Sequence, residues 1–249
     1  MSHSPATIVV LHDVGDLSIS WLRSAFTRRS DVTATFISGD DLLGGPYLSH
    51  EINRNGASFT IHTRDGQQLT PTSHDLLINR LVGPPRYLDL AVDCDDLSYA
   101  QAEVASLYIS ILNAFRCSTI NAKTGSSWRT ELDWALLAQQ NGLPVFSEEV
   151  TDATALASEE SPSPYLRRVL VFDDKVFGPP HPACLDELLP ELTKASEIDL
   201  LEVTFLEAAI DEWKYLTISI YSFLPIGGDA LVDAFCRRAK SGRRSANKG

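Results

Sequence analysis

The stretch from Asp75 to Ala122 constrains the fold most strongly, because it reads as a strand, a long helix and a second strand. The first strand is the short apolar run Leu76–Leu81, which ends before the Gly-Pro-Pro sequence at 83–85. An amphipathic helix is predicted over Tyr99–Asn113, and β-branched residues predict a strand over Ser118–Asn121. Two strands joined by one crossover helix form a parallel α/β unit.

Two further strands are expected in the same sheet, at Thr7–Leu11 and Val32–Ile37, because both are short and rich in apolar residues. Residues 57–70 are typical of an antiparallel hairpin that turns at Asp65-Gly66. The first 150 residues therefore predict an α/β domain with a mostly parallel sheet flanked by helices.

The second half of the chain predicts a smaller α+β domain over 166–240. A polar linker rich in Ser and Pro is expected over 151–165, and a flexible basic tail over 241–249. Between them the sequence predicts two short strands around Asp173-Asp174, a helix over Leu185–Ser196, strands over Leu200–Leu206 and Tyr215–Phe223, and a helix over Asp229–Ala239.

The order of several short motifs resembles the N-terminal, pre-ATP-grasp domain of ATP-grasp ligases. These motifs are an Ile-Asn-Arg strand ending near Arg80, an acidic-Ser-Tyr helix start, a strand ending in Asn121, and a helix that closes on Asn141-Gly-Leu-Pro-Val145. The likeness is greatest to the branch that modifies peptides and ribosomal protein S6. The segments 202–207, 213–221 and 227–235 are similar in order to the last strands and the C-terminal helix of that family.

The resemblance implies where an ATP site would lie. Its phosphate-binding lysines and glycine-rich flap should fall between Val145 and Arg167, an interval that contains no Lys and no Gly. Its Glu and Asn metal ligands should lie on the strand near Ile218, where Thr217 and Ser219 supply only hydroxyls. Glu202 stands where the family has an aspartate, and a surface or strand-end position is the favoured interpretation for it.

The chain is therefore interpreted as a degenerate, truncated ATP-grasp protein with no catalytic, cofactor-binding or metal-binding residues and no cofactor. Four residues are candidate contacts to a partner or substrate: Arg80, Arg167, Arg168 and Glu202. The resemblance implies a binding partner or scaffold in a biosynthetic pathway for a peptide or amino-acid-derived product. Its partner would be an active ATP-grasp ligase, another pathway enzyme or a peptide substrate, in a homodimer or heterodimer.

Two alternatives remain open from the sequence. One is a working ATP-dependent carboxylate–amine ligase whose nucleotide site is compact or completed by another chain, and the other is a small-molecule-binding α/β module. The pair His12-Asp13 follows the first strand, where α/β sheets bind ligands. The favoured interpretation of this region is a helix cap by Asp13 or Asp16.

Composition excludes several other classes of function. The net charge of −12 argues against a nucleic-acid surface, because phosphates would be repelled. No apolar run is long enough for a membrane span and the N-terminus lacks a secretory pattern, so a cytoplasmic protein is expected. The four cysteines form no Cys-x-x-Cys pair, which favours reduced thiols over a metal site.

Overall fold

The computed structural model describes residues 5–54, 56–71, 74–81, 83–84, 94–115, 117–121, 129–145, 165–209 and 212–246. The chain forms two compact units, residues 1–124 with 232–249, and residues 125–231. This division differs from the expected domains 1–150 and 166–240, because the helix before 145 joins the second unit and the last helix returns to the first. Most of the expected linker 151–165 lies outside the described residues.

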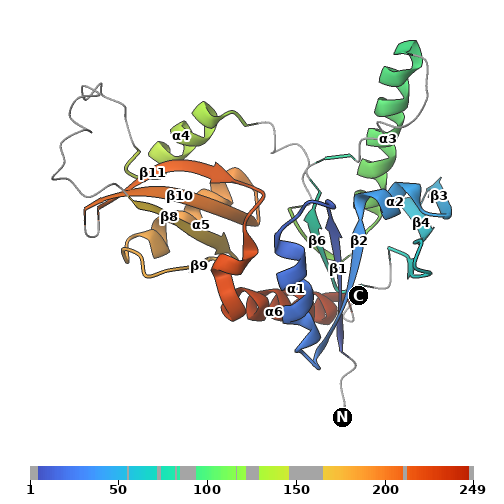
Figure 1. Ribbon diagram of the computed structural model, residues 1–249, viewed down its shortest axis with the longest axis horizontal. Helices are drawn as coiled ribbons and strands as arrows, with labels where there is room; N and C mark the ends of the chain where they lie inside the picture. The colour runs from blue at the N-terminus through green and yellow to red at the C-terminus, as the bar shows by residue number, and fades with distance from the viewer. Residues whose placement is uncertain are drawn as a thin grey trace. The chain divides into compact units, whose positions relative to one another are not determined.

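The first unit contains the predicted parallel sheet (Figure 1). Its strands are β1 (Ala6–His12), β2 (Val32–Ser38), β6 (Leu76–Arg80) and β7 (Ser118–Ile120), in the order β2-β1-β6-β7. All neighbouring pairs are parallel, so the prediction of one parallel sheet is confirmed. The helix α1 (Ser18–Thr27) connects β1 to β2, and the crossover helix α3 (Cys94–Ala114) connects β6 to β7.

A separate antiparallel sheet lies between β2 and β6 along the chain. Its strands are β3 (Tyr47–Asn53), β4 (Gly56–His62) and β5 (Gln68–Leu69), and the short helix α2 (Gly39–Gly44) precedes it. The hairpin at Asp65-Gly66 is confirmed, whereas β3 was not predicted from the sequence. Phe59 and Ile61 of β4 pack in one core with Tyr108 and Ile111 of α3.

The second unit contains a four-stranded antiparallel sheet in the order β11-β10-β8-β9. Its strands are β8 (Tyr165–Phe172), β9 (Lys175–Phe177), β10 (Leu200–Ala209) and β11 (Glu212–Ser219). The turn between β8 and β9 places Asp173 and Asp174 at positive φ, which aspartate tolerates better than most residues. Helices α4 (Glu131–Gln140) and α5 (Leu185–Ser196) share one core with this sheet.

The chain ends with a 3-10 turn, η3 (Leu224–Gly227), and the helix α6 (Gly228–Ala246). The tail expected to be flexible from residue 241 is therefore helical as far as Ala246. In the described part of the chain, α6 contacts other elements of the first unit through Arg29 with Asp233, Arg238 Nε with Ser118 Oγ at 2.9 Å, and Lys240 Nζ with Asp31 Oδ2 at 2.6 Å. Among the described residues, none of the helices is both long and apolar enough to cross a bilayer.

Candidate functional site on the antiparallel sheet

Glu202 is the third residue of β10, on the sheet face that turns away from α4 and α5. Successive side chains of a strand alternate between faces. Leu201 and Val203 belong to the core shared with the helices, so Glu202 points to the opposite face. Its side chain is nevertheless buried, with only 5% of the residue exposed, so the expectation of a surface position is wrong.

Both carboxylate oxygens of Glu202 have partners. Oε2 accepts a hydrogen bond from the backbone amide of Phe223 at 2.6 Å. Oε1 accepts a hydrogen bond from Nη1 of Arg168, in β8, at 3.4 Å. The Arg168 guanidinium also lies 5.6 Å from the centre of the Phe223 ring. Glu202 therefore connects the central strand to the segment that leads into η3.

The residues around Glu202 on this face supply hydroxyl groups rather than carboxylates. Ser219 of β11 lies directly opposite Glu202, and Thr217 lies opposite Thr204 of β10. Directly opposite residues of an antiparallel pair point to the same face. Next to Glu202, the described part of this face therefore presents one arginine and three hydroxyls but no second carboxylate, a set poor in the anionic oxygen ligands that Mg²⁺ requires.

Arg167 forms a different ion pair from Arg168. Its Nε lies 2.5 Å from Oε2 of Glu207, and its guanidinium lies 5.9 Å from the centre of the Tyr165 ring. Adjacent residues of β8 point to opposite faces, so the two arginines do not form one cationic site. The side chains of Arg167 and Arg168 are 41% and 49% exposed, which is typical of ion pairs at a surface.

Arg80 belongs to the first unit, at the carboxyl end of β6. Its Nε and Nη2 donate to Oδ2 and Oδ1 of Asp16 at 2.5 and 2.9 Å, and the guanidinium is buried. Burial alone would raise the pKa of Asp16, but the hydrogen bond and charge of Arg80 outweigh it and the pKa is lowered below its usual value of 3.8. Oδ1 of Asp16 also accepts from the amide of Ser18, as expected for an aspartate at a helix start. The arginine therefore fixes the loop before α1.

His12 lies next to Arg80 in the parallel register. Its Nδ1 lies 3.0 Å from the carbonyl oxygen of Asp13, which can only accept, so this nitrogen carries the proton. Nε2 is buried and has no hydrogen-bond partner among the described residues. One buried nitrogen without neighbouring ligands is insufficient for a metal site. The described residues contain no group of three His, Cys, Asp or Glu side chains that could hold a metal ion.

The sequence did not reveal the contact between Glu202 and the Phe223 amide. The two residues are 21 positions apart, and a backbone donor leaves no trace in residue identity. The register of β10 against β8 and β11 was the missing information, because it determines which polar residues share a face. The expected site of the lysines and flap falls largely in 146–164, outside the described residues.

No family model matches the chain, and no curated protein matches it. Several solved structures are similar to it. The chain is 14% identical to the macrocyclase MdnB from Microcystis aeruginosa MRC, with a TM-score of 0.66 and coverage of 93% of this chain and 97% of MdnB. It is 15% identical to the ATP-grasp ligase PsnB in complex with a phosphomimetic variant of a minimal precursor, Mg and ADP, with a TM-score of 0.70 and coverage of 96% and 99%.

A third similar structure is a RiPP-associated ATP-grasp ligase from Chryseobacterium gregarium in complex with ADP and a leader and core peptide. It is 10% identical, with a TM-score of 0.67 and coverage of 96% of this chain and 97% of that chain. These matches extend over nearly the whole of each chain. The protein therefore has the fold of peptide-modifying ATP-grasp ligases, and the resemblance inferred from the sequence motifs is confirmed at the level of the fold.

Proposed function

We propose that this chain is a non-catalytic protein of the ATP-grasp fold, which acts by binding a partner in the biosynthesis of a peptide or amino-acid-derived product in the cytoplasm. The observation that carries the proposal is the position of Glu202. Its carboxylate is used inside the protein, where it holds the Phe223 amide and faces the Arg168 guanidinium.

A metal ion at this position would meet unfavourable electrostatics. A Mg²⁺ ion bound to Oε1 of Glu202 would lie within a few ångströms of the positively charged Arg168 group, and like charges repel strongly at a partly buried site. Mg²⁺ also prefers an octahedron of oxygens about 2.0–2.1 Å away, usually including carboxylates and phosphates. Thr217 and Ser219 offer weaker neutral ligands.

The sequence between Val145 and Arg167 supports the same conclusion. It contains Glu148, Glu149 and further acidic residues but no lysine or glycine. A triphosphate needs cations and backbone amides that converge on it. Repulsion from this acidic segment would add to the unfavourable field of a chain of net charge −12.

The proposed partner is a peptide, an active ATP-grasp ligase or another enzyme of the pathway. The structural neighbours support a peptide: PsnB is complexed with precursor peptide PsnA2, and MdnC is bound with precursor peptide MdnA. Of the four candidate contacts, Arg168 pairs with Glu202 and Arg167 pairs with Glu207 in the second unit, and Arg80 belongs to the first unit. Arg80 is buried in its ion pair, whereas Arg167 and Arg168 are half exposed and accessible to a partner.

One alternative keeps a specific observation in its favour. PsnB, which has the same fold, was solved with Mg and ADP. The chain would then be an ATP-dependent carboxylate–amine ligase with a compact nucleotide site or one that another chain completes. Glu202 would have to exchange Arg168 for a metal ion when ATP binds.

Isothermal titration with Mg-ATP separates the two functions. The proposal predicts no heat of binding for the isolated chain at millimolar nucleotide, and, after addition of a co-purified partner, no heat beyond that of the partner titrated alone. Micromolar binding by the isolated chain would establish the ligase instead. Binding by the mixture that exceeds the binding by the partner alone would indicate a composite site.

A further inference from the structure

The end of the chain concentrates positive charge on an acidic protein. Residues 232–249 contain six of the 21 basic residues but only one of the 33 acidic residues. The rest of the chain contains 15 basic and 32 acidic residues, so the net charge of −12 combines a positive end with a strongly negative remainder. Such an uneven distribution gives one part of the surface a potential opposite to that of the whole protein.

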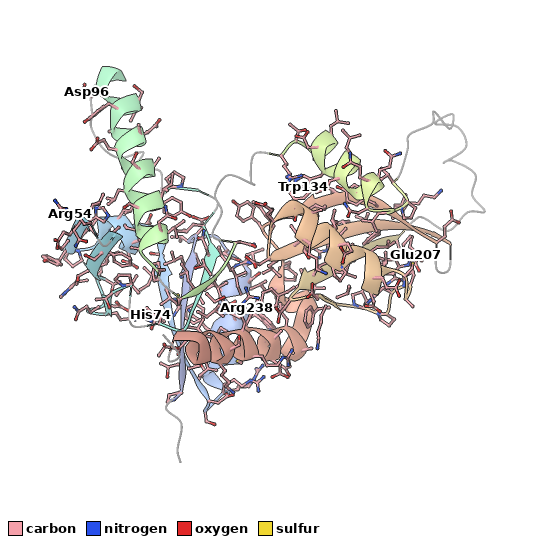
Figure 2. The ribbon with its side chains drawn as sticks, turned by 180° about the vertical axis from the view of Figure 1, so that it is seen from behind. Arg54, His74, Asp96, Trp134, Glu207 and Arg238 are labelled. Atoms are coloured by element: carbon pink, nitrogen blue, oxygen red, sulfur yellow. The ribbon has the colours of Figure 1, made fainter. Side chains whose placement is uncertain are left out.

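Helix α6 holds these charges in an ordered arrangement. The helix continues to Ala246, and Arg237 and Lys240 are neighbours on its surface, three positions apart and both exposed. Arg238, which is labelled in Figure 2, donates through Nε to Oγ of Ser118 in β7 at 2.9 Å. This contact fixes the rotation of α6 about its own axis, so the exposed cations keep one orientation on the first unit.

The C-terminal end of α1 brings further cations to the same place. It lies beside α6 (Figure 1), and the guanidinium of Arg29 pairs with Asp233, one helical turn before Arg237. Arg28 precedes Arg29 and is exposed. The segments 28–31 and 233–244 together contain seven basic and two acidic residues. We call Arg28, Arg29, Arg237 and Lys240 together the basic surface.

The basic surface already stabilises one carboxylate of the chain. Nζ of Lys240 donates to Oδ2 of Asp31 at 2.6 Å. The pKa of Asp31 is held below its usual value of 3.8, mainly by this hydrogen bond and further by the positive charges of Lys240 and Arg29. A carboxylate from another molecule would meet the same positive potential at the exposed Arg28 and Arg237.

We propose that the basic surface docks an acidic segment of a partner protein, whose Asp or Glu side chains pair with Arg237 and its neighbouring cations. Guanidinium groups suit such a partner, because their planar N–H donors bind a carboxylate through two parallel hydrogen bonds. The inference rests on the proposed function, in which the chain acts by binding a partner, and it adds the docking surface and the charge of that partner. Its test uses no nucleotide, so its failure is distinguishable from a failure of the proposed function.

An acidic protein segment fits this surface better than a bilayer or a nucleic acid does. A helix that lies in a membrane interface inserts its apolar side chains, but Val232, Phe235 and Ala239 of α6 are at most 1% exposed. A nucleic-acid strand would extend past the basic surface over a chain whose other charged residues are predominantly acidic, and its phosphates would be repelled there. A segment of a few acidic residues stays within the basic surface.

Fluorescence anisotropy of labelled octaglutamate, titrated with the purified full chain, tests the proposal. We expect saturable binding at about 50 mM salt that weakens at least about tenfold at about 300 mM salt, because the charges are exposed to screening. Arg237→Glu should raise the dissociation constant at least about fivefold, since an attraction becomes a repulsion. Arg64→Glu is the matched control. It makes the same change of charge in the exposed turn between β4 and β5, and it should change the dissociation constant less than about twofold.

Three results would overturn the proposal. The first is an absence of saturable binding by the wild type, or equal weakening by Arg237→Glu and Arg64→Glu. The second is displacement of the probe by a uridine octanucleotide at a lower concentration than by unlabelled octaglutamate, which would assign the basic surface to a nucleic acid. The third is cosedimentation with vesicles that contain about 30% phosphatidylserine, lost in Arg237→Glu, which would assign it to a membrane.

Discussion

Replacing Glu202 by Ala tests whether its carboxylate is a structural element. The substitution leaves the Phe223 amide without its acceptor, and an unsatisfied buried donor costs about 1–3 kcal/mol. The contact with Arg168 adds less than about 1 kcal/mol, because that side chain is 49% exposed and its charge is screened by water. We expect the free energy of unfolding of the second unit to fall by about 1–4 kcal/mol.

Urea denaturation followed by tryptophan fluorescence measures this loss, because Trp134 and Trp213 lie in the core of the same unit. Glu207→Ala is the matched control. It removes the same charge from the same strand but breaks only the pair with the half-exposed Arg167, so less than about 1 kcal/mol should be lost. Glu202→Gln keeps an oxygen acceptor for the Phe223 amide and should recover at least half of the lost stability.

A different pattern would refute the reasoning. If Glu202→Ala were no more destabilising than Glu207→Ala, the carboxylate would not be needed to hold the segment at Phe223. A change in nucleotide binding without a change in stability would assign Glu202 to a ligand site instead.

Three further predictions follow from other parts of the chain. Burial lowers the pKa of His74 below 6.5 despite the nearby charge of Asp75, so the unfolded chain binds more protons than the folded chain as the pH drops through 6.5. The free energy of unfolding of the first unit, measured by urea denaturation, should therefore fall over that pH range, and His74→Phe should make it less dependent on pH. Burial raises the pKa of the Cys117 thiol to about 11, so iodoacetamide at pH 8 should modify the exposed Cys184 before Cys117. A peptide map measures this order, and equal rates of modification of the two thiols would contradict the burial of Cys117. Deleting residues 241–249 should change the melting temperature by less than about 2 °C, because the contacts of α6 through Asp233, Arg238 and Lys240 remain. A larger decrease in melting temperature would mean that the end of α6 contributes to the core.

The parallel sheet could be predicted from the sequence because its central strands β1 and β6 are buried on both faces. Ile8, Val9, Val10 and Leu11 are all fully buried, and such continuous apolar runs are specific to central parallel strands. The helix over Leu185–Ser196 was predicted with its observed ends. Helix α4 has a Thr130–Asp133 capping box and Gly142 at a φ of 80°, two local signals that fix its boundaries.

The strand β3 could not be predicted in the same way. Most of its side chains are exposed, so the apolar alternation of a half-buried strand is missing. The helix α3 begins at Cys94, five residues before the expected start at Tyr99, because its first turns lack the buried stripe that identifies a helix in sequence.

The candidate site depended on information that residue identities do not contain. The arginines at 167 and 168 and Glu202 were identified, but their pairing follows from the register of three strands. Glu202 was expected at the surface or at a strand end, and a carboxylate is seldom buried without partners. Its burial is explained by the backbone amide of Phe223, a donor that only the folded chain reveals.

Binding of Mn²⁺-ATP, followed by electron paramagnetic resonance, tests the central claim most directly, because Mn²⁺ takes the same oxygen ligands as Mg²⁺. The free Mn²⁺-ATP signal should be the same with wild-type protein as with buffer, and Glu202→Gln should leave it unchanged. Loss of that signal with the wild type, and its return with Glu202→Gln, would show that Glu202 is a metal ligand in a working nucleotide site.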